Sequence, residues 1–418
     1  MSGRHAAAPL SVPLWTPGVF VLIALMIPGF VFILARFIGG LAAVTNLSQT
    51  SPWGIWVAID VATGVALAAG GFTTAALAHV FGRHAYETVT RPALLTAMLG
   101  YTFVPIALMI DIGRSWAIWH PIIYWQGNSV LFEVAMCVVL YTNVLYIEFL
   151  PIVAERYKDR VRLPGPLSIL NGIVEKFLQV ADRTLDRVMW VFILAGVVLS
   201  CMHQSGLGSL MLIAPTKLHP LWYTPILPLL FLLSAIAVGF PMVIFENALA
   251  SASLPIEDET PVLSALSRYT VILLGVYGIL KVADIVVRGA AGYLLEARVE
   301  SFSFLVELLV GVFLPFFLLL KPSVRKSRRG LFISACLIIF GVVLNRLNVF
   351  LVGFQSPYAE KGYFPSIGEL AVTTALIAAI MFLYRLLVTY LPVLTPRNHS
   401  HTTTACDGAL LQEGRAES

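Results

Sequence analysis

The sequence predicts an all-α polytopic membrane protein with about ten transmembrane helices. Three observations carry this prediction: hydrophobic residues make up 58% of the 418 residues, charged residues make up only 12%, and the mean hydropathy is +0.87. An ordinary soluble chain carries roughly 25% charged residues, so this chain cannot cover itself with polar surface in water. The composition therefore excludes a soluble enzyme, a disordered protein and a nucleic-acid-binding protein.

Ten apolar runs come close to the length of about 20 residues that a helix needs to cross the bilayer core. They cover residues 17–38, 53–81, 93–112, 129–153, 187–203, 222–246, 269–287, 302–320, 331–353 and 366–391. The first run has no basic segment directly before it and exceeds the roughly 7–15 residues of a signal-peptide core, so we expect it to remain as an anchor. We therefore divide the chain into an N-terminal segment 1–16, a transmembrane domain 17–391 and a polar tail 392–418, expected to be disordered.

Lysine and arginine collect on one side of the predicted helices. Among the connections and chain ends, eighteen of these residues fall on the side of the two termini, and five fall on the opposite side: Arg114, Lys217, Arg288, Arg298 and Lys361. Because positive residues concentrate in cytoplasmic loops, we expect both termini in the cytoplasm.

A spacing of acidic residues repeats along the chain. Asp111 ends the third run 22 residues before Glu133, and Asp284 ends the seventh run 23 residues before Glu307. Copies separated by four helices would share one orientation, as in parallel repeats. The alternative is that charged residues simply collect at helix ends, and both interpretations remain open.

Several ionisable residues fall within or beside the predicted spans, where a charge at the helix centre costs at least about 2.5–3.5 kcal/mol. The outer group is Asp60, Asp111, Arg114, Glu133, His203, Lys281, Asp284, Arg288, Glu307, Arg346 and Glu369. The inner group is His79, Arg91, Glu148 and Glu246. This distribution indicates a polar cavity that opens outward and a thinner polar route that leads inward.

Individual charges also have structural interpretations. Arg114 and Arg288 fit simple markers of helix ends, whereas Lys281 and Asp284, three residues apart, can neutralise each other. Arg346 lies deeper and needs a carboxylate partner, in either a structural or a functional pair. Glu133 differs because it has no basic neighbour at helical spacing in an apolar run. We expect a buried carboxyl there, whose pKa desolvation would raise into the range of a proton carrier.

Metal and haem sites are not expected in this chain. Of eight histidines, only His79 and His203 lie near the hydrocarbon, and they fall at opposite faces, some 25–30 Å apart. They cannot ligate one haem iron. The four cysteines form no C-x-x-C pair, which argues against an iron–sulfur cluster or a structural zinc site. Tyr101 lies near mid-helix beside Gly100, and its hydroxyl needs a partner at that depth, for which a quinone carbonyl is one candidate.

Nine strings, taken together and in order, resemble the NrfD/PsrC family of quinone-linked membrane subunits. The resemblance is strongest to its HybB-like branch, the integral membrane subunit of uptake nickel–iron hydrogenases. The strings are Pro52-Trp53-Gly54 with Trp56 and Asp60; Arg91-Pro92-Ala93-Leu94-Leu95; Gly100-Tyr101; Asp111 with Gly113-Arg114 and Trp116; Asn128-Ser129-Val130-Leu131-Phe132-Glu133; Met202-His203-Gln204-Ser205 with Gly208-Ser209-Leu210; His219-Pro220-Leu221-Trp222; Val243-Ile244-Phe245-Glu246; and Tyr363-Phe364-Pro365 with Gly368-Glu369-Leu370.

The resemblance implies a subunit of the bacterial inner membrane with two four-helix bundles plus two extra helices. Such a subunit holds no haem. It anchors a periplasmic ferredoxin-like iron–sulfur protein, which links a nickel–iron hydrogenase dimer to a lipid quinone, either menaquinone or ubiquinone. By position, Glu133 resembles the family's proton-conducting carboxylate, and Tyr101 resembles its quinone-associated tyrosine. Further polar positions with proposed roles in proton transfer or quinone binding are Asp60, Arg91, His203 and Glu246.

These residues lead to one mechanism and two rivals. We expect quinone to be reduced in the outer half of the membrane near Tyr101, His203 and Asp60, with protons drawn from the cytoplasm past Glu246 and Arg91 to Glu133. One rival is a subunit of another quinone-linked molybdenum or sulfur-compound oxidoreductase. The other is a secondary transporter, which would also carry intramembrane charges but would need no iron–sulfur partner.

Overall fold

The computed structural model describes residues 7–10, 12–158, 161, 165–213, 216–357 and 362–397. In these ranges ten helical segments are long and apolar enough to cross a membrane, and they confirm the ten predicted spans. They are Pro17–Gly39, Trp56–Val80, Glu87–Asp111, Val130–Tyr157, Arg187–Leu212, Leu227–Ser253, Thr260–Val287, Val299–Leu320, Arg328–Val352 and Ile367–Tyr390.

Several helices continue past the apolar runs that predict them. The fifth run was expected to end at residue 203, but α7 (Asn171–Leu212) continues through His203, Gln204 and Ser205. The seventh span begins at Thr260 rather than at residue 269. A helix satisfies its backbone hydrogen bonds internally, so polar side chains lower the local hydropathy without ending the helix.

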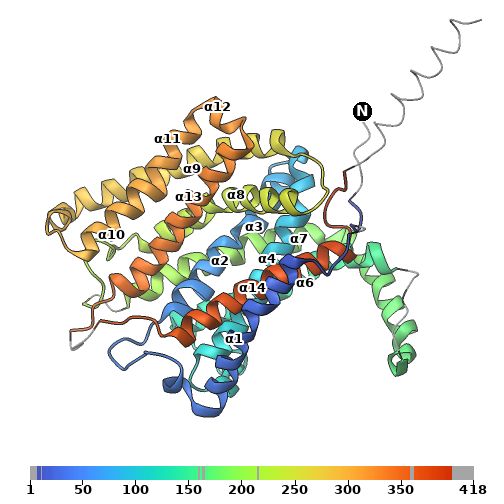
Figure 1. Ribbon diagram of the computed structural model, residues 1–418, viewed down its shortest axis with the longest axis horizontal. Helices are drawn as coiled ribbons and strands as arrows, with labels where there is room; N and C mark the ends of the chain where they lie inside the picture. Colours follow the sequence, from blue (N-terminus) through green and yellow to red (C-terminus); the bar gives the residue numbers. More distant parts are fainter. Residues whose placement is uncertain are drawn as a thin grey trace, which may run out of the picture.

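The spans form two four-helix bundles and a separate helix pair, as predicted (Figure 1). The first bundle contains α4 (Glu87–Asp111), α6 (Val130–Tyr157), α7 and the span made of η2 (Trp56–Thr63), α2 (Gly64–Leu67), α3 (Ala69–Ala75) and η3 (Ala76–Val80). The second contains α8 (Leu227–Ser253), α9 (Thr260–Val287), the span α10 (Val299–Leu308), η8 (Leu309–Phe313) and α11 (Leu314–Leu320), and the span α13 (Arg328–Leu347) with η9 (Asn348–Val352). The pair α1 (Pro17–Gly39) and α14 (Ile367–Tyr390) lies side by side, and α14 packs on α4.

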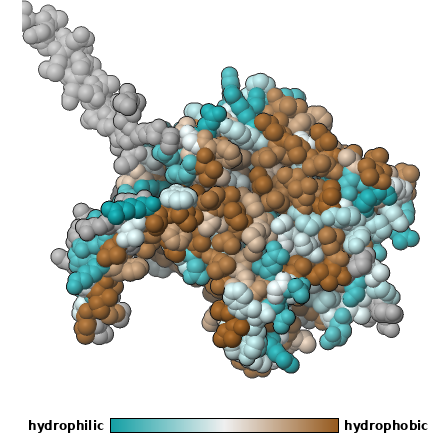
Figure 2. All heavy atoms as spheres, turned by 180° about the vertical axis from the view of Figure 1, so that it is seen from behind, coloured by the Kyte–Doolittle hydropathy of each residue, from teal (hydrophilic) through white to brown (hydrophobic). Residues whose placement is uncertain are grey.

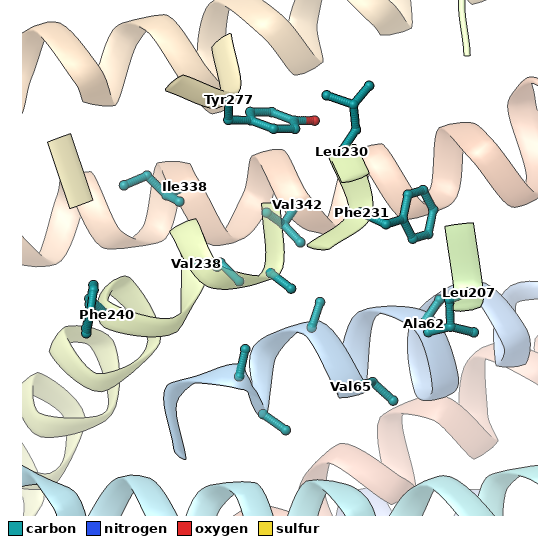
Figure 3. Close-up of a cluster of buried hydrophobic side chains, with 14 of the residues drawn as sticks. Ala62, Val65, Leu207, Leu230, Phe231, Val238, Phe240, Tyr277, Ile338 and Val342 are labelled. Atoms are coloured by element: carbon teal, nitrogen blue, oxygen red, sulfur yellow. The ribbon is translucent and has the colours of Figure 1, made fainter. Parts of the chain in front are cut away.

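The two bundles share one apolar core because α8 packs against both α3 and α7. The contact with α3 is close: a Cβ added to Gly239 would lie 2.5 Å from Thr73 Oγ1, so this crossing needs glycine. Small residues at such crossings let transmembrane helices approach closely. In the labelled cluster, Ala62 and Val65 lie across from Val238 of α8 (Figure 3).

The ends of the bundles differ in what they carry. At one end, which we call the termini end, the segments around Leu10 and Leu394 pack on Ile256, and Arg397 N donates a 2.9 Å hydrogen bond to Pro255 O. The packed chain therefore extends past residue 391 to Arg397, whereas the rest of the predicted tail, from residue 398, lies outside the described residues. The opposite, distal end carries the loop residues described at 112–129, 216–226, 288–298, 353–357 and 362–366.

The outer surface of the spans is largely apolar. Apolar side chains cover wide areas of the face in Figure 2, and the exposed residues include Phe20, Ile272 and Leu314. The first part of α7 extends away from the bundles (Figure 1). Its 42 residues correspond to about 63 Å, roughly twice the thickness of the bilayer core. These features, with the ten spans, establish a polytopic membrane protein.

Candidate functional site

A tyrosine–histidine pair lies in the middle of the first bundle. The Tyr101 hydroxyl of α4 is 3.1 Å from His203 Nδ1 of α7, and both side chains are fully buried. Tyr141 of α6 packs edge-on against Tyr101, with ring centroids 4.4 Å apart. Thr142 Oγ1 donates a 3.2 Å hydrogen bond to Tyr101 O. Three helices thus hold the pair, and the structure brings together the two residues that the sequence predicts for quinone.

Next to this pair is a row of polar atoms that are buried and have no hydrogen-bond partner among the described residues. Along α7 these are Ser200 Oγ, His203 Nε2 and Gln204 Oε1, and on α6 the matching atom is Glu148 Oε1. Buried polar atoms in proteins nearly always have a partner. The row therefore offers donors and acceptors to a ligand or to water beside the tyrosine–histidine pair.

Glu148 reaches into the bundle over a glycine. A Cβ added to Gly196 of α7 would lie 2.8 Å from Glu148 Oε1 and 3.3 Å from the Tyr141 ring. The missing side chain of Gly196 thus makes room for the carboxyl next to Tyr141. From the sequence, Glu148 was placed in the inner polar group without a specific role and Tyr141 was not singled out, although the two lie seven residues apart and so share one face of α6. That spacing is the signal that could have identified them.

Glu246 lies nearer the termini end, on α8. It is 9% exposed, and neither carboxylate oxygen has a hydrogen-bond partner in the described chain. The Thr96 hydroxyl of α4 and the Tyr384 hydroxyl of α14 lie next to it, equally unpartnered. These three groups from three helices make a second buried polar site, on the termini side of Glu148.

Arg91 and Asp60 make contacts away from the tyrosine–histidine pair. Arg91 pairs with Glu155 at 2.8 Å and donates to Pro392 O at 2.8 Å, so its guanidinium ties α4 to α6 and to the end of α14. Asp60 accepts a 2.7 Å hydrogen bond from Thr373 Oγ1 of α14. Asp60 thus faces the α1–α14 pair, because that side of η2 packs on α14, and its expected place in a site with Tyr101 and His203 stays a prediction.

Asp60 belongs to a polar cluster at the distal end. Asp111 interacts electrostatically with Asp60, Arg36 and Glu369. Arg36, buried on α1, donates to Ile110 O at 2.5 Å and to Ser115 Oγ at 3.1 Å. Glu369 closes a capping box with Ser366 at the start of α14. These bonds fasten the helix pair to the first bundle, which is a structural role.

Glu133 is exposed, so the expectation of a buried carboxyl is wrong. The physical reason is its position: α6 begins at Val130 after the N-cap Ser129, which places Glu133 in the first turn beside the distal loop. Its neighbour Leu131 is 57% exposed, whereas Val130 and Val134 pack against the core, so Glu133 lies on the outward side of this turn. A carboxylate in the first turn is stabilised by the helix dipole without burial.

Comparison with known proteins identifies the class of this membrane protein. Residues 43–357 match the family described as "Polysulphide reductase, NrfD", and the chain belongs to this family. It is 39% identical over 392 residues to a protein of Nitratidesulfovibrio vulgaris, covering 91% of this chain and 95% of that one. It is 33% identical over 399 residues to the probable Ni/Fe-hydrogenase 2 b-type cytochrome subunit of Escherichia coli, covering 94% and 96%.

A third relative is named for its quinone reaction. The chain is 27% identical over 199 residues to the integral membrane subunit of menaquinone reductase from N. vulgaris, covering 47% of this chain and 43% of that one. The b-type cytochrome name of the E. coli relative calls for haem ligands. His203 Nδ1 faces Tyr101, and His79 is exposed in η3 near the termini end, so among the described residues these two do not fit bis-histidine ligation.

An acidic residue at the termini end has a perturbed pKa. Glu259 precedes α9 and accepts a 3.1 Å hydrogen bond from Asn247 Nδ2. Burial, with repulsion from the neighbouring Glu257 and Asp258, raises the pKa of Glu259 to about 7. It also interacts with Tyr384, the neighbour of Glu246. Glu259 is therefore a protonatable group at the termini-end entrance to the Glu246 site.

We predict that Glu259 makes the folded state less stable as pH rises. Its folded pKa exceeds the unfolded value of roughly 4.3, so its stabilising contribution is complete below that value and is lost as pH rises through about 7. Glu259→Gln should remove this loss. Between about pH 5 and 8, the Tm of the wild type in detergent should fall relative to Glu259→Gln, by the equivalent of about 1 kcal/mol after allowance for partial exposure. The exposed control Glu296→Gln should follow the wild type, and parallel curves for all three would contradict the prediction.

Proposed function

We propose that this chain is the quinone-reactive membrane subunit of a hydrogen:quinone oxidoreductase complex. A periplasmic ferredoxin-like iron–sulfur subunit would receive electrons from a nickel–iron hydrogenase dimer and pass them to menaquinone or ubiquinone in this chain. The observation that carries the proposal is the buried Tyr101–His203 pair with the unpartnered Nε2 of His203. The names of the hydrogenase and menaquinone reductase relatives support it.

The proposed chemistry at the pair is reduction of a quinone to a quinol by two electrons and two protons. With a neutral imidazole, the pair can donate one hydrogen bond to a quinone oxygen, from His203 Nε2 when the Tyr101 hydroxyl donates to Nδ1 and from the Tyr101 hydroxyl when Nδ1 donates. This bond orients the quinone ring and stabilises the negative charge that develops on reduction. The electrons come from the iron–sulfur partner. The protons must be replaced after each turnover, and the buried carboxylates supply a route for them.

For the proton route we propose entry at the termini end, which the positive-inside rule assigns to the cytoplasm. Glu259 lies at the entrance, Glu246 with Tyr384 lies deeper, and Glu148 lies beside Tyr141 next to the pair. Arg91, which pairs with Glu155, keeps its proposed place on this route. Glu133 is exposed at the distal end, on the side of the site opposite the termini end. It keeps a proposed role in proton transfer, because an exposed carboxylate there can exchange protons with water at the distal loops.

A second candidate function keeps the same site but changes the partner. Menaquinone reductase is named for the quinone that it reduces and not for a hydrogenase, and its integral membrane subunit is similar to this chain over 199 residues. The chain would then pass electrons to quinone from another oxidoreductase. The subunits that co-purify in mild detergent distinguish the two: a nickel-containing partner supports the hydrogenase complex.

We predict that Tyr101→Phe lowers the quinone-linked rate of the purified complex by at least about 10-fold, because loss of a positioned proton donor typically costs 10²–10⁴-fold. Hydrogen-dependent reduction of a soluble dye, which bypasses the membrane site, should be unchanged. The matched control is Tyr390→Phe, at a half-exposed tyrosine of α14 near the termini end. Unchanged kcat and KM for quinone in Tyr101→Phe would remove the pair from the reaction.

We also predict that Glu133→Gln and Glu148→Gln each lose quinone-linked hydrogen oxidation, by about 100-fold, while dye-linked activity persists. A glutamine keeps the shape of the side chain but cannot carry a proton. The control Glu175→Gln, in the part of α7 outside the bundles, should retain full activity. Full quinone-linked turnover in Glu148→Gln would exclude Glu148 from the proton route, and full turnover in Glu133→Gln would exclude Glu133 from proton transfer on the distal side of the site.

A further inference from the structure

The second bundle buries a charged cluster that the quinone site does not use. Lys281 of α9, Glu307 of α10 and Arg346 of α13 form what we call the lysine cluster, and their exposed fractions are 4%, 1% and 0%. Lys281 Nζ pairs with Glu307 Oε1. The sequence predicted that Lys281 and Asp284 could neutralise each other, but this pair is not formed, because Asp284 pairs with Arg288 at 2.7 Å.

Glu307 is surrounded by donors. Its Oε1 accepts from Lys281 Nζ and, at 2.9 Å, from Asn345 Nδ2. Its Oε2 accepts from Trp222 Nε1 at 3.1 Å and from Asn348 Nδ2 at 2.7 Å. A protonated carboxyl needs an acceptor for its own O–H, and these four contacts are all donors. The surroundings therefore suit the ionised carboxylate.

Arg346 was expected to find a carboxylate, and that expectation is wrong. Its guanidinium donates to Asn345 Oδ1 at 2.5 Å, to Ser234 Oγ at 3.0 Å and to Phe231 O at 3.2 Å. It also lies 3.8 Å from the centroid of the Phe231 ring. All these partners are neutral, and an arginine keeps its proton in proteins. With a protonated lysine, the cluster would hold two positive charges against one negative charge.

Only one proton transfer removes this imbalance. If Lys281 loses its proton, Glu307 and Arg346 remain as a neutral pair, whereas a proton added to Glu307 would increase the excess. The other ionisable groups near Lys281 are Tyr277, whose hydroxyl is 3.3 Å from Nζ, and the Asp284–Arg288 pair, which is balanced. An uncompensated charge in the membrane interior is costly, so the cluster favours a lysine that alternates between its two forms.

Two small cavities lie along the cluster, each with room for about one water molecule. The cavity toward the distal end is lined by Lys281, Asp284, Thr224, Tyr277 and Asn345, among others. The cavity on the other side is lined by Glu307, Ser234, Tyr277 and Asn345, and it ends at the Gly311–Gly341 crossing. The rest of the lining of this second cavity is apolar and includes Ile338 and Val342, which lie near Tyr277 (Figure 3).

We propose that Lys281 is a proton-exchanging group and that the distal half of the second bundle is a proton-transfer unit separate from the quinone site. The ammonium of Lys281 gives one proton to water in the cavity beside Asp284 and Thr224, and it regains one from the same side or from the inner cavity. Glu307 stays ionised and holds the amine in place. Arg346 supplies the fixed positive charge that makes the neutral amine stable.

The direct test is a pH titration of the full chain in detergent, with ¹³Cε-labelled lysine observed by NMR. We expect one lysine resonance to lose its proton at a pH where the other resonances remain protonated, and to be missing in Lys281→Arg. Lys217→Met, which removes an exposed lysine at the distal end, should leave that resonance in place. If Lys281 stays protonated as long as the exposed lysines do, it is a permanent ion pair and the proposal fails. If Lys281→Arg does not fold, Glu307→Gln can assign the resonance instead, because loss of the partner carboxylate should shift the Lys281 resonance and leave the other lysine resonances in place.

A second measurement tests whether Lys281 takes part in moving protons across the membrane, rather than only exchanging a proton with water. This measurement rests on the proposed function. In vesicles that contain the complex, Lys281→Arg should lower the number of protons moved per electron, whereas the quinone-linked rate in the presence of a protonophore should match the wild type. An unchanged proton-to-electron ratio would overturn the transfer role. Absence of any quinone-linked rate in the wild type would instead contradict the proposed function, and the NMR titration would still decide the role of Lys281.

Discussion

The structure depends on one constraint: inside a membrane, each polar group must find its partner within the protein. Most polar groups obey it locally. Arg36 is buried among backbone carbonyls and a serine, and Glu307 is enclosed by four donors. Against this background, the buried polar atoms that lack a partner are informative. Many of them lie beside the Tyr101–His203 pair and at Glu246, and others, such as Ser334 Oγ and Arg346 Nε, lie in the second bundle.

The two bundles divide these groups between them. The first contains phenol, imidazole and carboxyl groups that face each other across α4, α6 and α7. The second contains a salt bridge and an arginine with neutral partners. The apolar core around α8 joins the bundles mechanically and separates their polar groups. In the proposed account, proton exchange at Lys281 therefore takes place in other helices than quinone reduction at the Tyr101–His203 pair.

The sequence predicted the fold better than it predicted the site, and the reason is physical. Length and hydropathy identify a span, so all ten were found. They do not show which side of a helix faces the core, because lipid-facing and core-facing positions are both apolar. Glu133 was therefore expected to be buried, which is wrong, and Asp60 was expected near Tyr101, whereas its observed contact is with Thr373 of α14. The Tyr101–His203 contact was predicted because the family resemblance singles out both residues. The position of Glu148 beside Tyr141 could be identified only from the structure, which shows that Gly196 makes room for its carboxyl.

The central claim is that quinone binds in the first bundle between α4, α6 and α7. Cross-linking of the membrane-embedded complex with a photoreactive quinone, followed by identification of the labelled peptides, tests it most directly. The account predicts label around Tyr101, Tyr141 and His203 that excess unlabelled quinone prevents. Specific label confined to the second bundle, or to the α1–α14 side of η2 around Asp60, would contradict the account.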